Sequence, residues 1–143
     1  MGQEDIVHDR DYGSPAGLTG KIQTVTGLID PEALGVCLTH EHLLIDLSDL
    51  LPPPDTATAR AFYARPVSAE VAAHCRNYSE FSTAHHKLDS VETAVEELGL
   101  FKQYGGHAMV DLTLAGIYRD PVGLQRISRA AGVHVVMGCG FYV

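Results

Sequence analysis

The stretch that decides the fold is VCLTHEHLLI, residues 36–45. It is apolar on both sides of its centre, which is the pattern of a strand with both faces buried, as in a parallel sheet. The histidines at positions 40 and 42 are two residues apart, and in a strand such residues point to the same face. We therefore expect His40 and His42 to project together at the end of this strand, with ring nitrogens that can converge on a cation.

The segments after this strand alternate between helix and strand. The capping-box form of residues 89–92, DSVE, and the pair Asp120-Pro121 mark where two helices begin. The predicted elements are a helix over 89–104, a strand over 107–114, a helix over 120–131 and a strand over 133–139. Each helical connection is long enough for a right-handed crossover between parallel strands. The sequence therefore predicts an α/β fold.

Two other stretches depart from this alternation. Residues 1–19 are polar and Gly-rich and predict a flexible arm, whereas residues 21–29 alternate polar and apolar around Gly27 and predict a short hairpin. Residues 50–87 form an excursion with one helix around 68–78, because its prolines forbid continuous regular structure. The excursion leaves the carboxyl end of the first strand, so we expect its Pro-rich part, residues 50–66, to lie at the same end of the fold as the two histidines.

Charge and composition exclude several classes of protein. Ten Lys and Arg stand against 18 Asp and Glu, for a net charge of -8, which argues against a nucleic-acid binder that depends on basic contacts to phosphates. No window approaches the roughly 18 consecutive apolar residues of a membrane span. The early acids of the N-terminus argue against a secretory signal, and three distant cysteines argue against a disulfide framework. We expect a cytoplasmic protein with a small-molecule substrate and neither nucleic acid nor membrane as partner.

The His-x-His spacing points to a metal site. Neutral imidazole suits Zn²⁺, and a catalytic zinc centre combines a few such ligands with an open position for water. The alternative is that His40 and His42 are surface residues that happen to alternate. The strand context favours the metal, because ligands of α/β folds collect at the carboxyl ends of strands.

Three segments resemble the phosphotriesterase family of the amidohydrolase superfamily. The first joins GKIQTVTG (20–27) to LGVCLTHEHL (34–43), close to the family pattern G-x-x-x-T-V-x-G and L-G-x-T-L-x-H-E-H, with Cys37 where threonine is usual. The second runs from Gly105 through VDLT (110–113) to GIYRD (116–120), and the third is residues 132–142. They stand in the family's order and spacing. The Pro-rich stretch and the ending CGFYV resemble the animal branch, the phosphotriesterase-related proteins.

The resemblance implies a fold, a site and a reaction. The fold is a (β/α)₈ barrel with two divalent metals, usually zinc, of which His40 and His42 bind the more buried one. A carboxylated Lys or a Glu from strand four, histidines from strands five and six, and an Asp from strand eight complete the family's site. A metal-activated hydroxide attacks an ester, lactone, phosphotriester or N-acyl amide bond. The resemblance thus implies a zinc-dependent hydrolase, with a homodimer as one assembly of the full-length form.

The matching segments reach only the third strand of such a barrel. A barrel needs eight strands and typically ~250 residues, so we expect residues 20–143 to be a partial barrel domain, truncated after strands one to three. We expect the chain alone to have no measurable hydrolase activity. The alternative is a non-catalytic remnant or a fragment that binds a partner.

Three further residues have more than one interpretation. Tyr142 follows the third strand, where it either lines the substrate pocket or packs within the fold. For Asp111, in the middle of the second strand, a structural hydrogen-bonding role is favoured over that of orienting a ligand histidine. Arg119 is expected to pair with an acid in the barrel. No residue of this chain is predicted to be a catalytic nucleophile.

Overall fold

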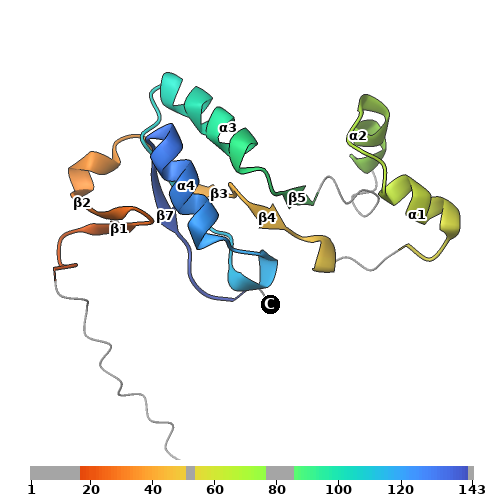
Figure 1. Ribbon diagram of the computed structural model, residues 1–143, viewed down its shortest axis with the longest axis horizontal. Coiled ribbons are helices and arrows are strands. Elements are labelled where there is room, and N and C mark those ends of the chain that lie inside the picture. Colours follow the sequence, from red (N-terminus) through yellow and green to blue (C-terminus); the bar gives the residue numbers. More distant parts are fainter. Residues whose placement is uncertain (1–16, 51–53, 77–85, 142–143) are drawn as a thin grey trace, which may run out of the picture.

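The computed structural model describes residues 17–50, 54–76 and 86–141. Its centre is a parallel sheet in the order β3-β6-β7, formed by Cys37–Glu41, Ala108–Asp111 and His134–Met137. Helices α3 (Val91–Gln103) and α4 (Pro121–Ala131) connect these strands and lie together on one face of the sheet (Figure 1). The predicted alternation of strand and helix, and with it the α/β class, is confirmed.

The apolar core lies between the two helices and the sheet. Its buried members are Leu43, Leu44, Ala94, Leu98, Met109, Leu124, Ile127, Val133 and Val135. Burial of one such side chain favours the folded state by about 1.5–3 kcal/mol. These residues come from α3, β6, α4, β7 and the segments that follow β3 and precede β7, so the core is built from contacts between segments far apart in sequence.

The predicted helix caps can be compared with the observed ends of α3 and α4. Asp120 caps α4 as predicted, because its Oδ1 accepts a hydrogen bond from the amide of Gly123 at 2.9 Å. Gly132 ends that helix with φ at 63°, a left-handed conformation that glycine adopts without strain. For α3 the predicted capping box is wrong by one residue. Ser90 is the cap, since its Oγ accepts from the Thr93 amide at 3.1 Å, and Asp89 pairs with Lys87 instead.

The segment 36–45 is not one strand with two buried faces. β3 ends at Glu41, and a separate short strand, β4 (Ile45–Asp46), pairs antiparallel with β5 (Lys87–Leu88). In the middle of β3, Leu38 and His40 are exposed. The prediction of a buried strand was wrong because, in the described part of the chain, β3 pairs with β6 alone and forms an edge of its sheet.

The predicted N-terminal hairpin is confirmed. β1 (Ile22–Thr24) and β2 (Gly27–Ile29) pair antiparallel, and a 3₁₀ turn, η1 (Pro31–Leu34), follows. Gly27 has φ at 132°, so the tight turn needs a glycine there. The amide of Val25 donates to the carbonyl of Val135 at 2.9 Å, which places the hairpin along β7.

The excursion contains more structure than its sequence predicts. A 3₁₀ turn, η2 (Ser48–Leu50), opens it, and two short helices follow, α1 (Ala57–Tyr63) and α2 (Ala69–Cys75). Helix α2 matches the predicted helix and begins at the cap Ser68, whereas α1 was not predicted. Figure 1 shows the two helices apart from the sheet. The arm at 1–16 and the prolines at 52 and 53 lie outside the described residues.

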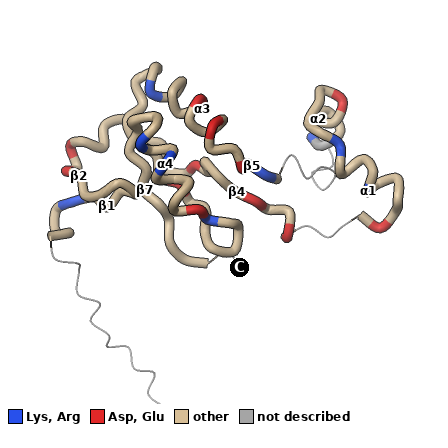
Figure 2. Tube along the Cα trace, in the orientation of Figure 1, with Lys and Arg blue, Asp and Glu red and all other residues tan. Residues whose placement is uncertain are grey.

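Acidic and basic residues are interspersed over the described chain (Figure 2). None of the described helices is long and apolar enough to cross a lipid bilayer.

Candidate metal centre

The two histidines of the His-x-His sequence lie side by side at the carboxyl end of β3. Their ring centres are 5.7 Å apart, and the ring planes meet at 70°. Two imidazoles on one tetrahedral zinc, with bonds of about 2.0–2.1 Å, have ring centres about 5 Å apart. The observed spacing therefore fits a shared cation after a small rotation of either side chain. The assignment of His40 and His42 as ligands stays a prediction.

The two rings differ in how firmly they are held. Nδ1 of His42 lies 2.9 Å from the hydroxyl of Thr113, which is buried in the loop after β6. The same hydroxyl donates to the carbonyl of Leu44 at 2.9 Å. His40 is exposed, and its ring meets that of His42. The centre thus combines one fixed imidazole with one that can adjust.

Asp111 holds the loops that carry this centre. Its carboxylate is fully buried; Oδ2 accepts from the amide of Leu43 at 2.8 Å, and Oδ1 accepts from the amide of Thr113 at 2.8 Å. The structural role expected for Asp111 is therefore confirmed. Arg119 was expected to pair with an acid, but it donates to the carbonyl of Gly138 at 3.0 Å, because the end of β7 lies beside it.

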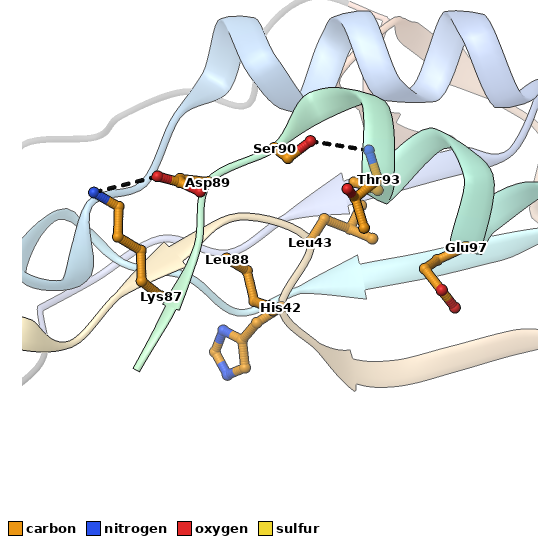
Figure 3. Close-up of a pocket in the computed structure, with 9 residues that line it drawn as sticks. His42, Leu43, Lys87, Leu88, Asp89, Ser90, Thr93 and Glu97 are labelled. Carbon is orange, nitrogen blue, oxygen red and sulfur yellow. Dashed lines mark hydrogen bonds and ion pairs between the residues drawn. The ribbon is translucent and has the colours of Figure 1, made fainter. Parts of the chain in front are cut away.

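A cavity of about 290 Å³ adjoins the centre (Figure 3). It lies between the start of α3 and the chain that leaves β3, and its lining mixes apolar Leu43 and Leu88 with charged Lys87, Asp89 and Glu97. In Figure 3 Leu43 points toward α3, whereas the ring of His42 points away from that helix. A cation would therefore approach the His42 ring from the side opposite the apolar core.

Within the described residues, no group of three His, Cys, Asp or Glu side chains is placed to hold a metal ion. The pair at positions 40 and 42 would supply two ligands, fewer than the three or four protein ligands of a zinc centre. Partial burial raises the pKa of the Cys37 thiol above its ordinary value, which disfavours the thiolate that would bind metal. Tyr142 lies outside the described residues, so its place at the pocket stays a prediction.

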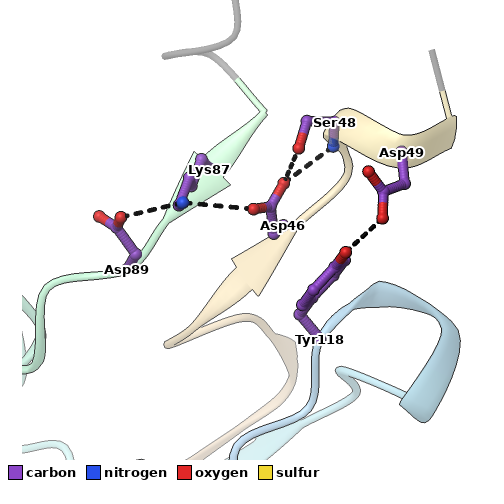
Figure 4. Close-up of polar contacts among 6 residues, drawn as sticks. All are labelled: Asp46, Ser48, Asp49, Lys87, Asp89 and Tyr118. Atoms are coloured by element: carbon purple, nitrogen blue, oxygen red, sulfur yellow. Dashed lines mark hydrogen bonds and ion pairs between the residues drawn. The ribbon is translucent and has the colours of Figure 1, made fainter.

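A polar network joins the excursion to the sheet at the same end (Figure 4). Hydrogen bonds from Ser48, and the ammonium of Lys87 at 3.4 Å, lower the pKa of Asp46. Tyr118, which follows β6, donates its hydroxyl to Asp49 of η2, and this bond raises the pKa of the phenol. The start of the excursion therefore lies against the segment that follows β6.

Comparison with known proteins decides the family. Residues 20–143, which include the sheet, both covering helices and the histidine pair, match the sequence profile of the phosphotriesterase family. The chain belongs to the phosphotriesterase family. The family resemblance of the three sequence segments is thus confirmed.

Curated relatives in this family are hydrolases. The N-acetyltaurine hydrolase of Homo sapiens is 35% identical over 132 residues, and that of Tetraodon nigroviridis is 38% identical over 133 residues. Each match covers 90% of this chain and 37% of the relative. The chain therefore spans a little over a third of the length of these phosphotriesterase-family proteins.

Solved structures of the family agree with the fold. A resiniferatoxin-binding protein from Rhodobacter sphaeroides superposes with a TM-score of 0.80 at 39% identity, over 87% of this chain and 35% of that protein. The phosphotriesterase from Mycobacterium tuberculosis gives a TM-score of 0.53 at 25% identity, over 86% of this chain and 30% of that protein. This chain therefore matches about a third of each of these two proteins.

Sequence reasoning missed two contacts, that of Thr113 with His42 and that of Tyr118 with Asp49. Thr113 was not singled out, because a threonine at the end of a strand carries no motif of its own. Only the fold shows that residues 42 and 113 meet. The Tyr118–Asp49 contact was missed for the same reason, since the two residues belong to loops far apart in sequence.

Proposed function

We propose that this chain supplies the first two ligands, His40 and His42, of a zinc centre in a hydrolase of the phosphotriesterase family. In this proposal β3, β6 and β7 are the first three strands of a (β/α)₈ barrel. The observation that carries it is the pair of adjacent imidazoles at the carboxyl end of a parallel strand, 5.7 Å apart. Barrel active sites lie at that end of the strands.

The residues present have defined roles in such a centre. A bound divalent cation would supply Lewis-acid activation of water and of the scissile bond. His40 and His42 would bind it as neutral imidazoles, one adjustable and one held by Thr113. Asp111 binds the backbone amides of Leu43, which follows His42, and of Thr113, which contacts the His42 ring. No side chain of the described residues is assigned the part of a nucleophile.

The proposed substrate is a small cytoplasmic N-acyl compound, whose amide bond is cleaved by water. Support comes from the curated relatives, which are named N-acetyltaurine hydrolases and share 33–38% identity with this chain in the animal examples. Lactones and phosphotriesters are the next candidates. A lactonase from Listeria monocytogenes and the phosphotriesterase from Mycobacterium tuberculosis have the same fold over this region.

A non-catalytic, partner-binding fragment is the second candidate function. The observation that favours it is the exposure of β3, where Leu38 is 40% exposed beside His40 on a strand with an unpaired edge in the described structure. Unpaired edges are templates for another chain. Only the first proposal needs metal ligands beyond the two histidines.

The test is to measure zinc binding and turnover on the 143-residue chain. Isothermal titration should show zinc binding that weakens in His40→Ala and in His42→Ala. His107→Ala is the matched control, because that exposed histidine precedes β6 at the opposite end of the sheet. Zinc binding that ignores both site variants would contradict the metal centre.

The same samples are then assayed with N-acetyltaurine, a lactone and a phosphotriester. We expect no measurable turnover, because two ligands hold a cation too weakly to activate water. Turnover that is lost in His40→Ala would show that this chain assembles a working centre by itself and would overturn the expected need for further ligands.

A further inference from the structure

The hydrogen bond between His42 and Thr113 determines where the proton of the imidazole sits. A threonine hydroxyl has one proton to donate and two lone pairs that accept. The carbonyl of Leu44, 2.9 Å from the Thr113 oxygen, can only accept, so the hydroxyl proton is used there. Toward His42, also at 2.9 Å, the hydroxyl can therefore only accept, and Nδ1 of His42 must carry the proton.

The surroundings prevent the hydroxyl from turning to another arrangement. Thr113 is 1% exposed, so water does not offer it a different partner. Its amide is bound by Oδ1 of Asp111, and Oδ2 of the same carboxylate binds the amide of Leu43, the residue after His42. One buried carboxylate thus fixes the backbone at both ends of the His42–Thr113 bond.

We propose that Thr113 is a positioning residue for His42: its hydroxyl keeps Nδ1 protonated and leaves Nε2 as the only ring nitrogen with a free lone pair for a metal. The metal part rests on the proposed zinc centre, whereas the tautomer is a property of the chain without metal. Ligand histidines in zinc sites are fixed in this way by a partner on the other ring nitrogen. Here the partner is a hydroxyl that is itself locked by a backbone carbonyl.

The first test reads the tautomer directly in the metal-free chain. Long-range ¹H–¹⁵N correlation spectra of the ¹⁵N-labelled protein, at a pH where imidazoles are neutral, distinguish a protonated ring nitrogen from a bare one. The signals of His42 are identified by their loss in His42→Gln. We expect a protonated Nδ1 and a bare Nε2. A protonated Nε2 with a bare Nδ1 in the wild type would overturn the proposal, and this result needs no variant of Thr113.

The second test separates the hydroxyl from the rest of the side chain. Thr113→Ser keeps the hydroxyl and should keep the tautomer, whereas the nearly isosteric Thr113→Val removes it and should give a mixture of both tautomers. In zinc titrations Thr113→Val should bind about 10-fold or more weakly than Thr113→Ser. If the two variants share one tautomer and one zinc affinity, Thr113 does not position His42. Circular dichroism confirms that both are folded.

The two tests distinguish failure of this inference from failure of the proposed function. A wild-type chain with a protonated Nδ1 that binds no zinc contradicts the metal centre and supports the hydrogen-bond role of Thr113. A chain that binds zinc through His42 with the other tautomer supports the metal centre and rejects the role of Thr113.

Discussion

The sheet region and the α1–α2 pair are stabilised by different kinds of contact. In the sheet region Leu98, Ile127 and Val135 are almost completely buried, and their contacts join elements separated by tens of residues. In the α1–α2 pair the contacts are local. The rings of Phe62 and His74 are 4.6 Å apart, and the guanidinium of Arg65 lies over the Phe62 ring at 5.2 Å.

The difference shows which part of the chain carries the cooperative stability. Apolar area removed from water is the main favourable term in folding, and it is concentrated under α3 and α4. Among the described residues of the excursion, the apolar side chain that is fully buried is that of Val71. The sheet region should therefore unfold as one unit, while the α1–α2 pair opens with a smaller free energy of its own.

Shortening a core side chain should give the largest effect. Ile127 has no exposed surface, so Ile127→Ala should lower the free energy of unfolding by about 2–5 kcal/mol in urea titrations. Val71→Ala is the matched control from the other region. It should speed amide hydrogen exchange in residues 57–75 and leave the main transition in place. An equal shift of that transition in both variants would show that the two regions unfold together.

Asp111→Asn should have the next largest effect. Asparagine keeps one acceptor oxygen but turns an amide group toward the donor of Leu43 or Thr113, so one buried amide loses its partner. We expect a loss of about 1–3 kcal/mol in the free energy of unfolding. Asp120→Asn is the control, because Asn and Asp cap helices almost equally well. Equal stability of the two variants would argue against the bridging role of Asp111.

The junction between the regions should respond to acid. Ser48 and Lys87 lower the pKa of Asp46, so the contribution of Asp46 to the folded state is complete above its ordinary pKa of about 3.9. It is lost as the pH falls through the lower pKa of the folded state. The protection of amides in β4 and β5 against hydrogen exchange, relative to the intrinsic exchange rate at each pH, should therefore decrease in that acidic range. Asp46→Asn should remove this pH dependence, and a wild-type profile without it would exclude Asp46 as the cause.

The smallest effect is expected within the α1–α2 pair itself. Arg65 and Glu70 form an ion pair at 2.9 Å, but both side chains are largely exposed to solvent. Exposed pairs of this kind contribute little and are screened by salt. Glu70→Gln should leave the main melting temperature unchanged at any salt concentration. A clear decrease at low salt that vanishes at high salt would mean that the pair contributes to the stability of the whole chain.

How much the sequence could predict depended on whether the signal was local. The helices α3 and α4 and the strand β7 follow from apolar spacing, glycine ends and caps, so they were predicted within a few residues. The error at Ser90 arose because Asp89 and Ser90 are equally good caps, and only the ion pair of Asp89 with Lys87 decides between them. Helix α1 was missed because it has only seven residues, which is too short a segment to show helical periodicity, and prolines lie on both sides of it.

Of the candidate metal centre, only the pair of histidines on one segment could be predicted from the sequence. His40 and His42 lie together as the i, i+2 spacing predicts, although β3 ends at Glu41 and its pairing with β6 is irregular between Leu38 and Glu41. The contact of His42 with Thr113 requires that β3 and β6 be neighbours, with a register shift between Leu38 and Glu41, and no spacing within the sequence encodes that. The same holds for the exposure of β3, since the number of partners of a strand is a property of the assembled sheet.

The pairing of β4 with β5 has a consequence for how this chain can be re-engineered. Asp46 and Lys87 are directly opposite each other in an antiparallel ladder, so residues 47–86 leave and re-enter the sheet region at one point. Residues 47–86 can therefore be removed or replaced as one segment. Replacing it by a two-residue Asn-Gly turn would join two strands that already have hairpin geometry and would reduce the loop-closure entropy. The same exit and re-entry point could equally accept a foreign domain, such as a fluorescent reporter, placed at the edge of the cavity that Lys87 and His42 both line.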